Sequence, residues 1–482
     1  MNEIGITVKK EDDMPEWYSQ VVLKSGMADY SAVKGCAVIR PLGYAIWQNI
    51  MDFFNERISL MGVENAYFPM FIPESFFHRE AQHVDGFAPE VAWVEQKSDT
   101  NERIAVRPTS EAIMYDSYAK WIRSHRDLPL RINQWCNIVR WEVSDVKIFL
   151  RSREFLWQEG HCVYATEEEC QKEVLDILEE YRRLVEELLA IPVIKGEKSE
   201  HERFPGAKRT YTIESFMPDG KALQAGTSHN LGQGFAKAFN ITFQGTDEKD
   251  HHPWQSSWGF STRLLGAMVM QHSDDKGLVL PPRVAPTQAV IIPITIKKKP
   301  ELSEQVLTKA KELEKQLKDA GVRVKLDDRE EYSPGFKYSD WELKGVPIRI
   351  EVGPRDIENN QCILAKRNDG EKSTVNLDSL SEKVKETLEQ IHQELFDKAK
   401  KQIDEKTVQV KTYDELKKAM EERKIAIAHH CGDPESEDVI KAELGGVTTR
   451  CRPMGEDQAD EGAVCVHTGK PAKYKVIFSK NY

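Results

Sequence analysis

Residues 132–161 read INQWCNIVRWEVSDVKIFLRSREFLWQEGH. The first part, through Glu142, is rich in apolar and β-branched residues, and the part from Phe155 onward alternates aromatic and charged groups. This pattern predicts two β-strands joined by a polar loop, with Arg140 at the end of the first strand and Arg151 in the loop. Because arginine offers phosphate a planar pair of donors and stacks on purine faces, such a hairpin suits a nucleoside triphosphate. An amphipathic hairpin with solvated charges is the simpler alternative, and this stretch alone leaves both open.

Length and composition restrict the class of protein. A chain of 482 residues predicts two to three domains, and 40% hydrophobic with 30% charged residues is typical of a globular protein. The chain lacks a run of about 18 apolar residues and its first residues lack the apolar centre of a signal peptide, so we expect a cytoplasmic protein that spans no membrane. The eight cysteines are scattered, which favours free thiols. A net charge of −12 argues against nonspecific coating of DNA or RNA, although a tRNA can still bind a local basic patch.

Residues 107–111, RPTSE, follow a short predicted strand and open a predicted helix. A serine or threonine at this place is commonly only an N-cap. The hydroxyl of Thr109 and the carboxylate of Glu111 can instead satisfy the ammonium group of a substrate. Both interpretations stay open from these residues alone.

Two later segments place polar side chains on predicted strands. Residues 221–230, KALQAGTSHN, alternate like a strand and contain Gln224, Thr227 and His229, although a lone histidine there is more often structural. Residues 255–268, QSSWGFSTRLLGAM, predict a strand that breaks into a helix with Arg263 in its first turn. Small residues follow in that helix, which would let it cross the sheet closely.

A predicted helix over residues 41–61 leads into a predicted strand that ends in prolines, of which Pro69 is the first. Any helix–strand packing unit would look like this. Taken in chain order, however, this unit, the hairpin of residues 132–161 and the strand–helix of residues 255–268 resemble motifs 1, 2 and 3 of the class II aminoacyl-tRNA synthetases. The finer resemblance is to prolyl-tRNA synthetases of the archaeal and eukaryotic type, and it spans nearly the whole chain.

This resemblance implies an α+β catalytic domain on an antiparallel sheet over residues 1–283, an α/β anticodon-binding domain over 284–380, and a linker helix with a small α/β zinc-binding-like domain over 381–482. The residue pattern agrees, because strands and helices alternate from Gln288 onward and predict a small, largely parallel sheet. Motif 1 implies a homodimer. We infer no editing insertion, because the strands and helices predicted between His161 and Ser257 use most of that segment.

The resemblance also implies substrates and roles for individual residues. The reaction would join L-proline to ATP, with Mg2+, and pass the prolyl group to tRNA(Pro). Arg140 and Arg263 are the expected catalytic residues. The residues expected to bind proline are Thr109, Glu111, Arg140, Trp157, Glu159, His161, His229 and Ser257. Those expected to bind ATP and Mg2+ are Arg140, Glu142, Arg151, Phe155, Gln224, Thr227, Ser261 and Arg263. Those expected to read the anticodon are Arg349, Glu351 and Lys366.

A structural zinc site is expected in the C-terminal module, with Cys431, Cys451, Cys465 and His467 as ligands. The sequence departs from the family pattern at two positions. The C-x4-C pair lacks its second cysteine, because Ser436 follows Cys431, and His467 stands where a final cysteine is usual. A bound Zn2+ and a degenerate site without metal therefore both stay open.

Two other functions compete with proline activation. A sister synthetase for threonine, serine or glycine would share all three motifs, but residues 157–161 do not present the metal ligands of a threonine enzyme convincingly. A synthetase-like regulator that binds tRNA without catalysis typically loses the motif arginines, whereas Arg140, Arg151 and Arg263 are present here. A small apolar pocket excludes small side chains poorly, so we also expect activation of alanine and cysteine.

Overall fold

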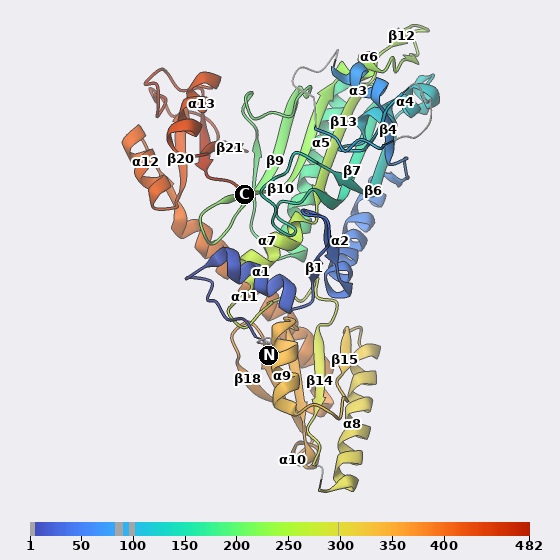
Figure 1. Cartoon of the computed structure of the whole chain (residues 1–482), viewed down its shortest axis with the longest axis vertical. Coiled ribbons are helices and arrows are strands. Elements are labelled where there is room, and N and C mark those ends of the chain that lie inside the picture. The colour runs from blue at the N-terminus through green and yellow to red at the C-terminus, as the bar shows by residue number, and fades with distance from the viewer. Residues whose placement is uncertain (1–4, 82–89, 96–101, 297) are drawn as a thin grey trace.

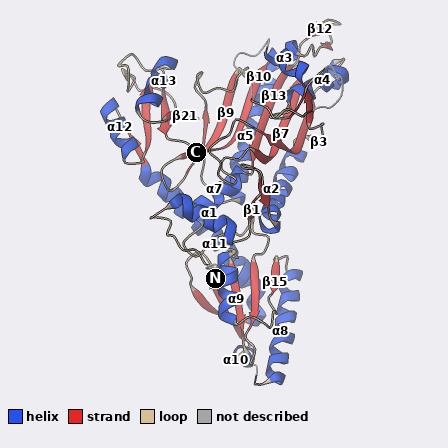
Figure 2. Ribbon diagram, viewed as in Figure 1, coloured by secondary structure: helices blue, strands red, loops and turns tan. Residues whose placement is uncertain are grey.

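The computed structural model describes residues 5–81, 90–95, 102–296 and 298–482. Figures 1 and 2 show three parts: a large sheet with its helices, a smaller sheet–helix unit at one end, and a C-terminal module beside the large sheet. In the described residues, no helix has both the length and the apolar character that a membrane crossing requires.

The first part ends at the helix that carries Arg263. Its helices are α1 (Met14–Lys24), α2 (Pro41–Leu60), α3 (Glu74–Ala81), α4 (Glu111–Trp121), η1 (His125–Asp127), α5 (Glu167–Arg183), η2 (Leu184–Leu188), α6 (Gly234–Ala238) and α7 (Arg263–His272). Its strands are β1 (Ala28–Tyr30), β2 (Ala37–Ile39), β3 (Glu64–Asn65), β4 (Phe71–Pro73), β5 (Ile104–Val106), β6 (Leu130–Val139), β7 (Glu154–Tyr164), β8 (Ile194–Glu197), β9 (Arg209–Phe216), β10 (Ala222–Gly232), β11 (Phe243–Gln244), β12 (Asp250–His251) and β13 (Trp254–Ser261).

The other two parts follow in sequence. The smaller unit contains β14 (Ala289–Pro293), α8 (Pro300–Asp319), β15 (Val324–Leu326), α9 (Pro334–Leu343), β16 (Ile348–Val352), α10 (Pro354–Glu358), β17 (Gln361–Lys366), β18 (Lys372–Asn376) and η3 (Leu377–Ser379). The C-terminal part contains α11 (Leu380–Lys406), β19 (Thr407–Gln409), α12 (Tyr413–Glu421), β20 (Ile425–His430), α13 (Pro434–Glu443), β21 (Thr448–Pro453) and β22 (Tyr474–Ser479).

The large sheet has the strand order β19-β20-β22-β21-β8-β9-β10-β13-β7-β6-β3. Its central neighbours, from β8 to β6, all pair antiparallel, as the sequence predicts for the catalytic domain. Arg452 and Pro453 of β21 pair with Glu197 and Gly196 of β8. The C-terminal module expected over 381–482 therefore extends the catalytic sheet instead of forming a sheet of its own.

The hairpin that the sequence predicts over 132–161 is β6 and β7, paired from Leu130↔Val163 to Val139↔Glu154. The first strand stops at Val139, not at Glu142. Arg140 and Glu142 thus lie in the turn region beyond the ladder. Because neither residue belongs to the strand, their side chains need not point to alternate faces of the sheet.

Helices α2, α5 and α7 build the main apolar core with the sheet, and α1 joins it through Trp17 and Tyr18. The start of α5 confirms the sequence prediction, because Thr166 and Glu169 form a capping box. Gly266 of α7 allows a close approach to the hairpin loop and not, as predicted, to the sheet: a Cβ there would lie 2.7 Å from a Leu150 side-chain carbon. A larger side chain would push α7 away from the hairpin loop.

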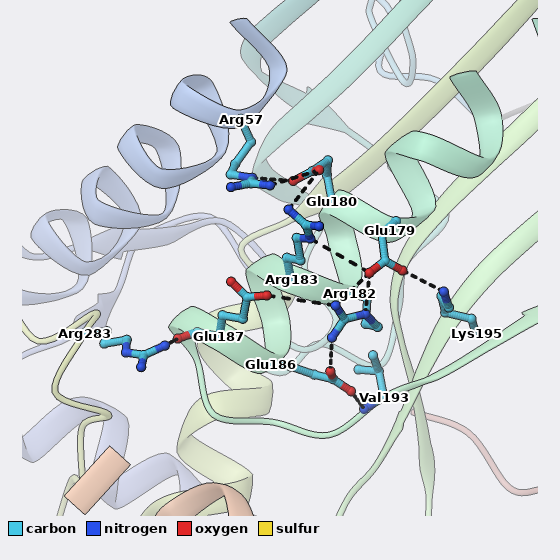
Figure 3. A network of polar contacts seen from close by, with 10 residues as sticks. All are labelled: Arg57, Glu179, Glu180, Arg182, Arg183, Glu186, Glu187, Val193, Lys195 and Arg283. Carbon is cyan, nitrogen blue, oxygen red and sulfur yellow. Dashed lines mark hydrogen bonds and ion pairs between the residues drawn. The ribbon is translucent and has the colours of Figure 1, made fainter. Parts of the chain in front are cut away.

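Ion pairs on the outer face of α5 tie neighbouring elements together (Figure 3). Arg57 of α2 donates to Glu180 at 2.5 Å, and Lys195 of β8 lies 2.6 Å from Glu179. Arg182 pairs with Glu179 at 2.7 Å. The network therefore ties α5 to the long helix α2 and to strand β8.

The smaller unit has the strand order β15-β14-β16-β17-β18. Strand β14 pairs parallel with β15 and β16, as predicted, but β16–β17 and β17–β18 are antiparallel. The expectation of a largely parallel sheet is therefore wrong for half of its pairings. The connection between Val352 and Gln361 is too short for a parallel crossover, which needs a dozen or more residues.

Candidate active site

A cavity of about 220 Å³ opens on the face of the large sheet formed by β7, β10 and β13. Ten residues that the sequence singles out line it: Thr109, Glu111, Arg140, Trp157, Glu159, His161, Gln224, Thr227, His229 and Ser257. The Nε1 atom of Trp157 and the Oγ atom of Ser257 are buried without a hydrogen-bond partner in the described residues. Unpaired buried polar groups are costly, so two such atoms in one cavity indicate a polar ligand.

The segment that carries Thr109 and Glu111 is held by side chains and not by a helix cap. Thr109 Oγ1 donates to Glu111 Oε2. Ser110 occupies the N-cap position of α4 but makes no cap hydrogen bond, and its hydroxyl donates to Glu159 Oε1 at 2.5 Å. The N-cap alternative is therefore wrong here, because both hydroxyls serve carboxylates of the cavity.

Glu159 and His161 form a buried pair on β7. Glu159 Oε2 lies 3.1 Å from His161 Nε2, and Oε1 also accepts from Gln134 Nε2 at 3.1 Å. Burial alone would raise the pKa of Glu159, but the hydrogen bonds from His161, Ser110 and Gln134, with the charge of His161, lower this pKa to about 2. The carboxylate therefore stays ionised and shapes the cavity floor.

His229 is uncharged, in contrast to the ionised Glu159. Burial, with the nearby charges of His161 and Lys198, lowers the pKa of His229 to about 3, so the imidazole is neutral. Its Nδ1 lies 3.0 Å from Thr210 Oγ1, and the ring of Phe204 packs on it with centroids 4.6 Å apart. Sequence reasoning missed Thr210 and Phe204. Thr210 begins a strand without a motif, and Phe204 lies in an irregular loop.

Arg140, Arg151 and Arg263 carry positive charge toward the same region. In the described residues, no salt bridge pairs any of them with a carboxylate. Burial lowers the pKa of Arg263 to about 10, and the charges of Arg140 and Arg151 add to this effect. A buried arginine whose pKa is lowered by burial and by neighbouring cations favours an anionic ligand.

Aromatic side chains flank these arginines. The guanidinium of Arg140 lies 5.7 Å from the ring centroids of both Phe155 and Trp157. Glu142, by contrast, is exposed in the turn. Ser261 Oγ accepts a hydrogen bond from the Arg263 backbone N–H at 3.1 Å, so it shapes the start of α7.

A second cavity, of about 620 Å³, continues from Arg151 past Lys147 and Lys221 to the C-terminal residue Tyr482. The Tyr482 hydroxyl donates to Asp219 Oδ2 at 2.7 Å. Tyr482 is thus fixed at the turn between β9 and β10, where it lines the same cavity as the hairpin loop.

Three buried groups beneath the site come from distant parts of the chain. Glu214 of β9 lies 2.8 Å from Lys198 Nζ and 3.0 Å from Arg450 Nη2 of β21. Burial would raise the pKa of Glu214, but the charges of Arg450 and Lys198 lower it. Sequence reasoning missed this triad, since lysine, glutamate and arginine at unrelated spacings give no signal.

The zinc-ligand set predicted from the sequence is corrected in one member. His430, Cys431 and Cys465 place their ligand atoms within 4.8 Å of one another. Cys451 lies elsewhere, in an apolar cluster with Phe216 and Ile477. The module brings His430, at the end of β20, to the cysteines instead.

Ser436 links this cluster to His467. Its Oγ lies 3.1 Å from His430 Nε2 and 2.8 Å from His467 Nδ1. Two cysteines and two histidines are a common ligand set for tetrahedral Zn2+. Three of these four residues, His430, Cys431 and Cys465, are placed to hold a structural Zn2+, and Ser436 separates His467 from them.

The residues predicted to read the anticodon are engaged within the protein. Arg349 Nη2 lies 2.9 Å from Glu351 Oε1, which also pairs with Lys372 at 3.0 Å. Lys366 is buried and contacts three carboxylates, of which Asp369 is nearest at 2.8 Å. These pairs orient the side chains away from free solution, and their anticodon role stays a prediction.

Comparison with known proteins accounts for this arrangement. Residues 93–272 match the family model of the tRNA synthetase class II core domain (G, H, P, S and T), and residues 288–387 match the anticodon binding domain. Residues 413–482 match the C-terminal domain of prolyl-tRNA synthetase. A proline–tRNA ligase of Alkaliphilus oremlandii is 52% identical over 98% of this chain and 97% of its own length. The chain belongs to the prolyl-tRNA synthetase family.

Other members of the prolyl-tRNA synthetase family show how broadly the likeness extends. Proline–tRNA ligase 2 of Clostridioides difficile is 48% identical over 98% of this chain and 97% of its own length. The cytoplasmic proline–tRNA ligase of Arabidopsis thaliana is 47% identical over 99% of this chain and 91% of its own length. The likeness to this family covers nearly the whole chain, including the C-terminal module.

Proposed function

We propose that this chain is a proline–tRNA ligase that activates L-proline with ATP and transfers it to the 3′ end of tRNA(Pro). The observation that carries the proposal is the convergence of Arg140, Arg151 and Arg263, none of which forms a salt bridge with a carboxylate of the described residues, beside a cavity that holds Thr109 and Glu111. Cations without acidic partners fit the phosphates of ATP. A hydroxyl and a carboxylate fit the secondary ammonium of proline.

In the first step, a carboxylate oxygen of proline attacks the α-phosphorus of ATP, and pyrophosphate leaves. Arg140 holds the α-phosphate and the proline carboxylate, while Arg151 and Arg263 hold the outer phosphates. Such a displacement needs positioning and charge neutralisation and no protein nucleophile. Phe155 stacks on adenine, and Glu142 orients its amino group.

In the second step, a hydroxyl of the terminal ribose of tRNA attacks the prolyl carbonyl, and AMP leaves. Thr109, Glu111 and neutral His229 hold the amino acid, while Trp157, Glu159, His161 and Ser257 shape its pocket. Bound Mg2+ would neutralise phosphate charge, and Gln224 and Thr227 are the residues that would face ATP and this ion.

The enzyme has no inserted editing domain that would remove wrongly attached amino acids. Between β7 and β13, the elements α5, β8, β9 and β10 belong to the catalytic core. We also propose activation of alanine and cysteine, because a cavity sized for proline admits smaller side chains.

We further propose a homodimer and a structural Zn2+. Large apolar side chains are exposed at the end of the motif 1 helix and in the segment after it, with Leu60 79% and Tyr67 73% exposed. His430, Cys431, Cys465 and His467 would hold the metal, which would brace the C-terminal module. Molar mass by light scattering tests the dimer.

Amino-acid-dependent ATP–pyrophosphate exchange tests the main proposal, with proline, threonine, serine, glycine, alanine and cysteine as separate substrates. Strong exchange with proline, followed by charging of tRNA(Pro), supports it. Exchange that is strongest with threonine, serine or glycine favours a sister synthetase. Folded protein that supports exchange with none of the six favours the noncatalytic regulator.

A further inference from the structure

Helix α7 connects the ATP side of the site to the point where all three parts of the chain meet (Figure 1). It begins at Arg263 and ends at His272, and every residue after the first is buried. Ten residues of α-helix span about 15 Å. Because a close-packed interior transmits displacement, the two ends of such a helix cannot shift independently.

The beginning of α7 is fixed to the hairpin loop. Arg263 Nε donates to the carbonyl of Leu150 at 3.1 Å, and the hydroxyl of Tyr18 donates to the carbonyl of Ile148 at 2.8 Å. Gly266 and Leu150 are so closely packed that α7 cannot move nearer to the loop. The position of Arg263 therefore depends on where α7 lies.

The end of α7 is held by elements that take no part in the cavity. Lys10 Nζ donates to the carbonyl of Met270 at 2.6 Å, and Gln271 Nε2 donates to Gln402 Oε1 of α11 at 2.9 Å. His272 Nε2 lies 2.8 Å from the carbonyl of Leu189. These contacts come from the N-terminal segment, the linker helix and the loop after η2.

The strongest of these contacts comes from the anticodon-binding unit. Arg367, just after β17, donates through Nη1 and Nη2 to both oxygens of Asp274, at 2.8 and 2.6 Å. Its Nε donates to the carbonyl of Glu342 in α9 at 2.8 Å, so the guanidinium is fixed on its own side. The Arg367 side chain is 4% exposed. The Asp274 side chain is 42% exposed, so the defined geometry of this pair comes from its two parallel hydrogen bonds and from the buried guanidinium.

We propose that Asp274 and Arg367 are positioning residues, which set the place of Arg263 at the ATP phosphates through α7. The inference rests on the proposed function for the role of Arg263. It assigns the anticodon-binding unit a part in amino-acid activation, before any tRNA is bound. Neither residue of the pair lines the proline pocket, which is built on β7, β10 and β13.

The test compares Arg367→Met and Asp274→Asn with the wild-type full-length protein. In pyrophosphate exchange, we expect the KM for ATP to rise about three- to thirtyfold, the range typical of coupling between distant sites. The KM for proline should stay within about twofold. Arg367→Lys keeps the charge but loses the fork, so its KM for ATP should lie between those of Arg367→Met and the wild type.

Lys276→Met is the matched control. Lys276 lies two residues after Asp274 and pairs with Glu342 of the same unit at 3.0 Å, but the lysine side chain is 64% exposed. Loss of this pair should leave both KM values unchanged. An unchanged KM for ATP in Arg367→Met and Asp274→Asn, or an equal rise of both KM values, would overturn the inference.

Calorimetric titration with ATP alone separates this inference from the proposed function. A wild-type protein that binds ATP but exchanges with none of the six amino acids would contradict the proposed function. The ATP affinities of the same variants would still test the link between Arg367 and Arg263.

Discussion

Glu214, on β9 of the catalytic sheet, accepts hydrogen bonds from Arg450, which belongs to the C-terminal module more than 200 residues later in the chain. Both side chains are buried, at 0% and 4% exposure. Lys198, just after β8, is a second cation on the same carboxylate. The C-terminal module is thus joined to the floor of the site by a desolvated ion pair as well as by the β21–β8 ladder.

Arg450→Met should destabilise the protein strongly, because it leaves Glu214 buried with Lys198 as its one remaining cation among the described residues. Because Lys198 still compensates the carboxylate, the cost is that of losing hydrogen bonds to a charged group, about 1.5–3 kcal/mol. Arg452→Met is the control, since Arg452 pairs with Asp457 at 2.6 Å while both side chains are more than a quarter exposed. Loss of the Arg452–Asp457 pair should lower the free energy of unfolding by about 1 kcal/mol or less. Thermal unfolding of both variants measures the difference, and equal transitions would contradict the prediction.

Arg140→Ala and Arg263→Ala should each lower kcat/KM for proline-dependent pyrophosphate exchange by roughly 100- to 1000-fold, as for other groups that stabilise charge in a transition state. Neither arginine forms a salt bridge with a carboxylate of the described residues, so stability should change little. Arg126→Ala, an exposed arginine of η1, is the control and should retain wild-type activity. Near-normal exchange in either active-site variant would remove the proposed role of that arginine.

His272 should make stability depend on pH. Burial lowers the pKa of His272 to about 3 from an ordinary value near 6.5. Between pH 3 and 6.5, His272 binds a proton in the unfolded chain but not in the folded chain. The contribution of His272 to the free energy of unfolding therefore rises with pH and is lost as the pH falls below 6.5.

His272→Gln can keep the hydrogen bond to Leu189 without taking up the proton. The slope of unfolding free energy against pH should therefore fall by up to about 1.4 kcal/mol per unit between pH 4 and 6. Urea denaturation at several pH values measures this slope. An identical slope in the wild type and the variant would show that His272 is not responsible.

Misactivation follows from the shape of the cavity. Alanine and cysteine are smaller than proline, and a pocket distinguishes such side chains by only about 1–3 kcal/mol. Both should support pyrophosphate exchange above the level without amino acid, at roughly 10- to 200-fold lower kcat/KM than proline. A failure of both amino acids to exceed the blank would disprove this expectation.

Much of the site could be predicted because each family motif is local in sequence. Residues such as Thr109, Glu111 and Arg140 carry their signal in the few residues around them, and the cavity brings them together. Arg450 and Phe204 gave no such signal, since their roles depend on contacts between distant segments. Local patterns therefore predict the groups expected to touch substrates better than the groups that support them.

The same reasoning explains why the structure excludes one open alternative, the N-cap, and one expected metal ligand. Ser110 has the local pattern of an N-cap, but its hydroxyl bonds Glu159, a tertiary contact that overrides the local preference. Cys451 was expected to bind metal because of its residue type, yet its strand turns it into an apolar cluster. In both cases the residue type alone did not predict which groups the side chain contacts.

The C-terminal cluster should hold one zinc ion per chain. His430, Cys431 and Cys465 converge within 4.8 Å, and His467 lies next to them through Ser436. Because metal binding to a preformed set of ligands stabilises the folded state, Cys465→Ser should lose the zinc and lower the unfolding temperature of the protein. Cys451→Ser, outside the cluster, should keep it. Elemental analysis of protein produced with added zinc measures the content, and a metal-free wild type would support the degenerate site instead.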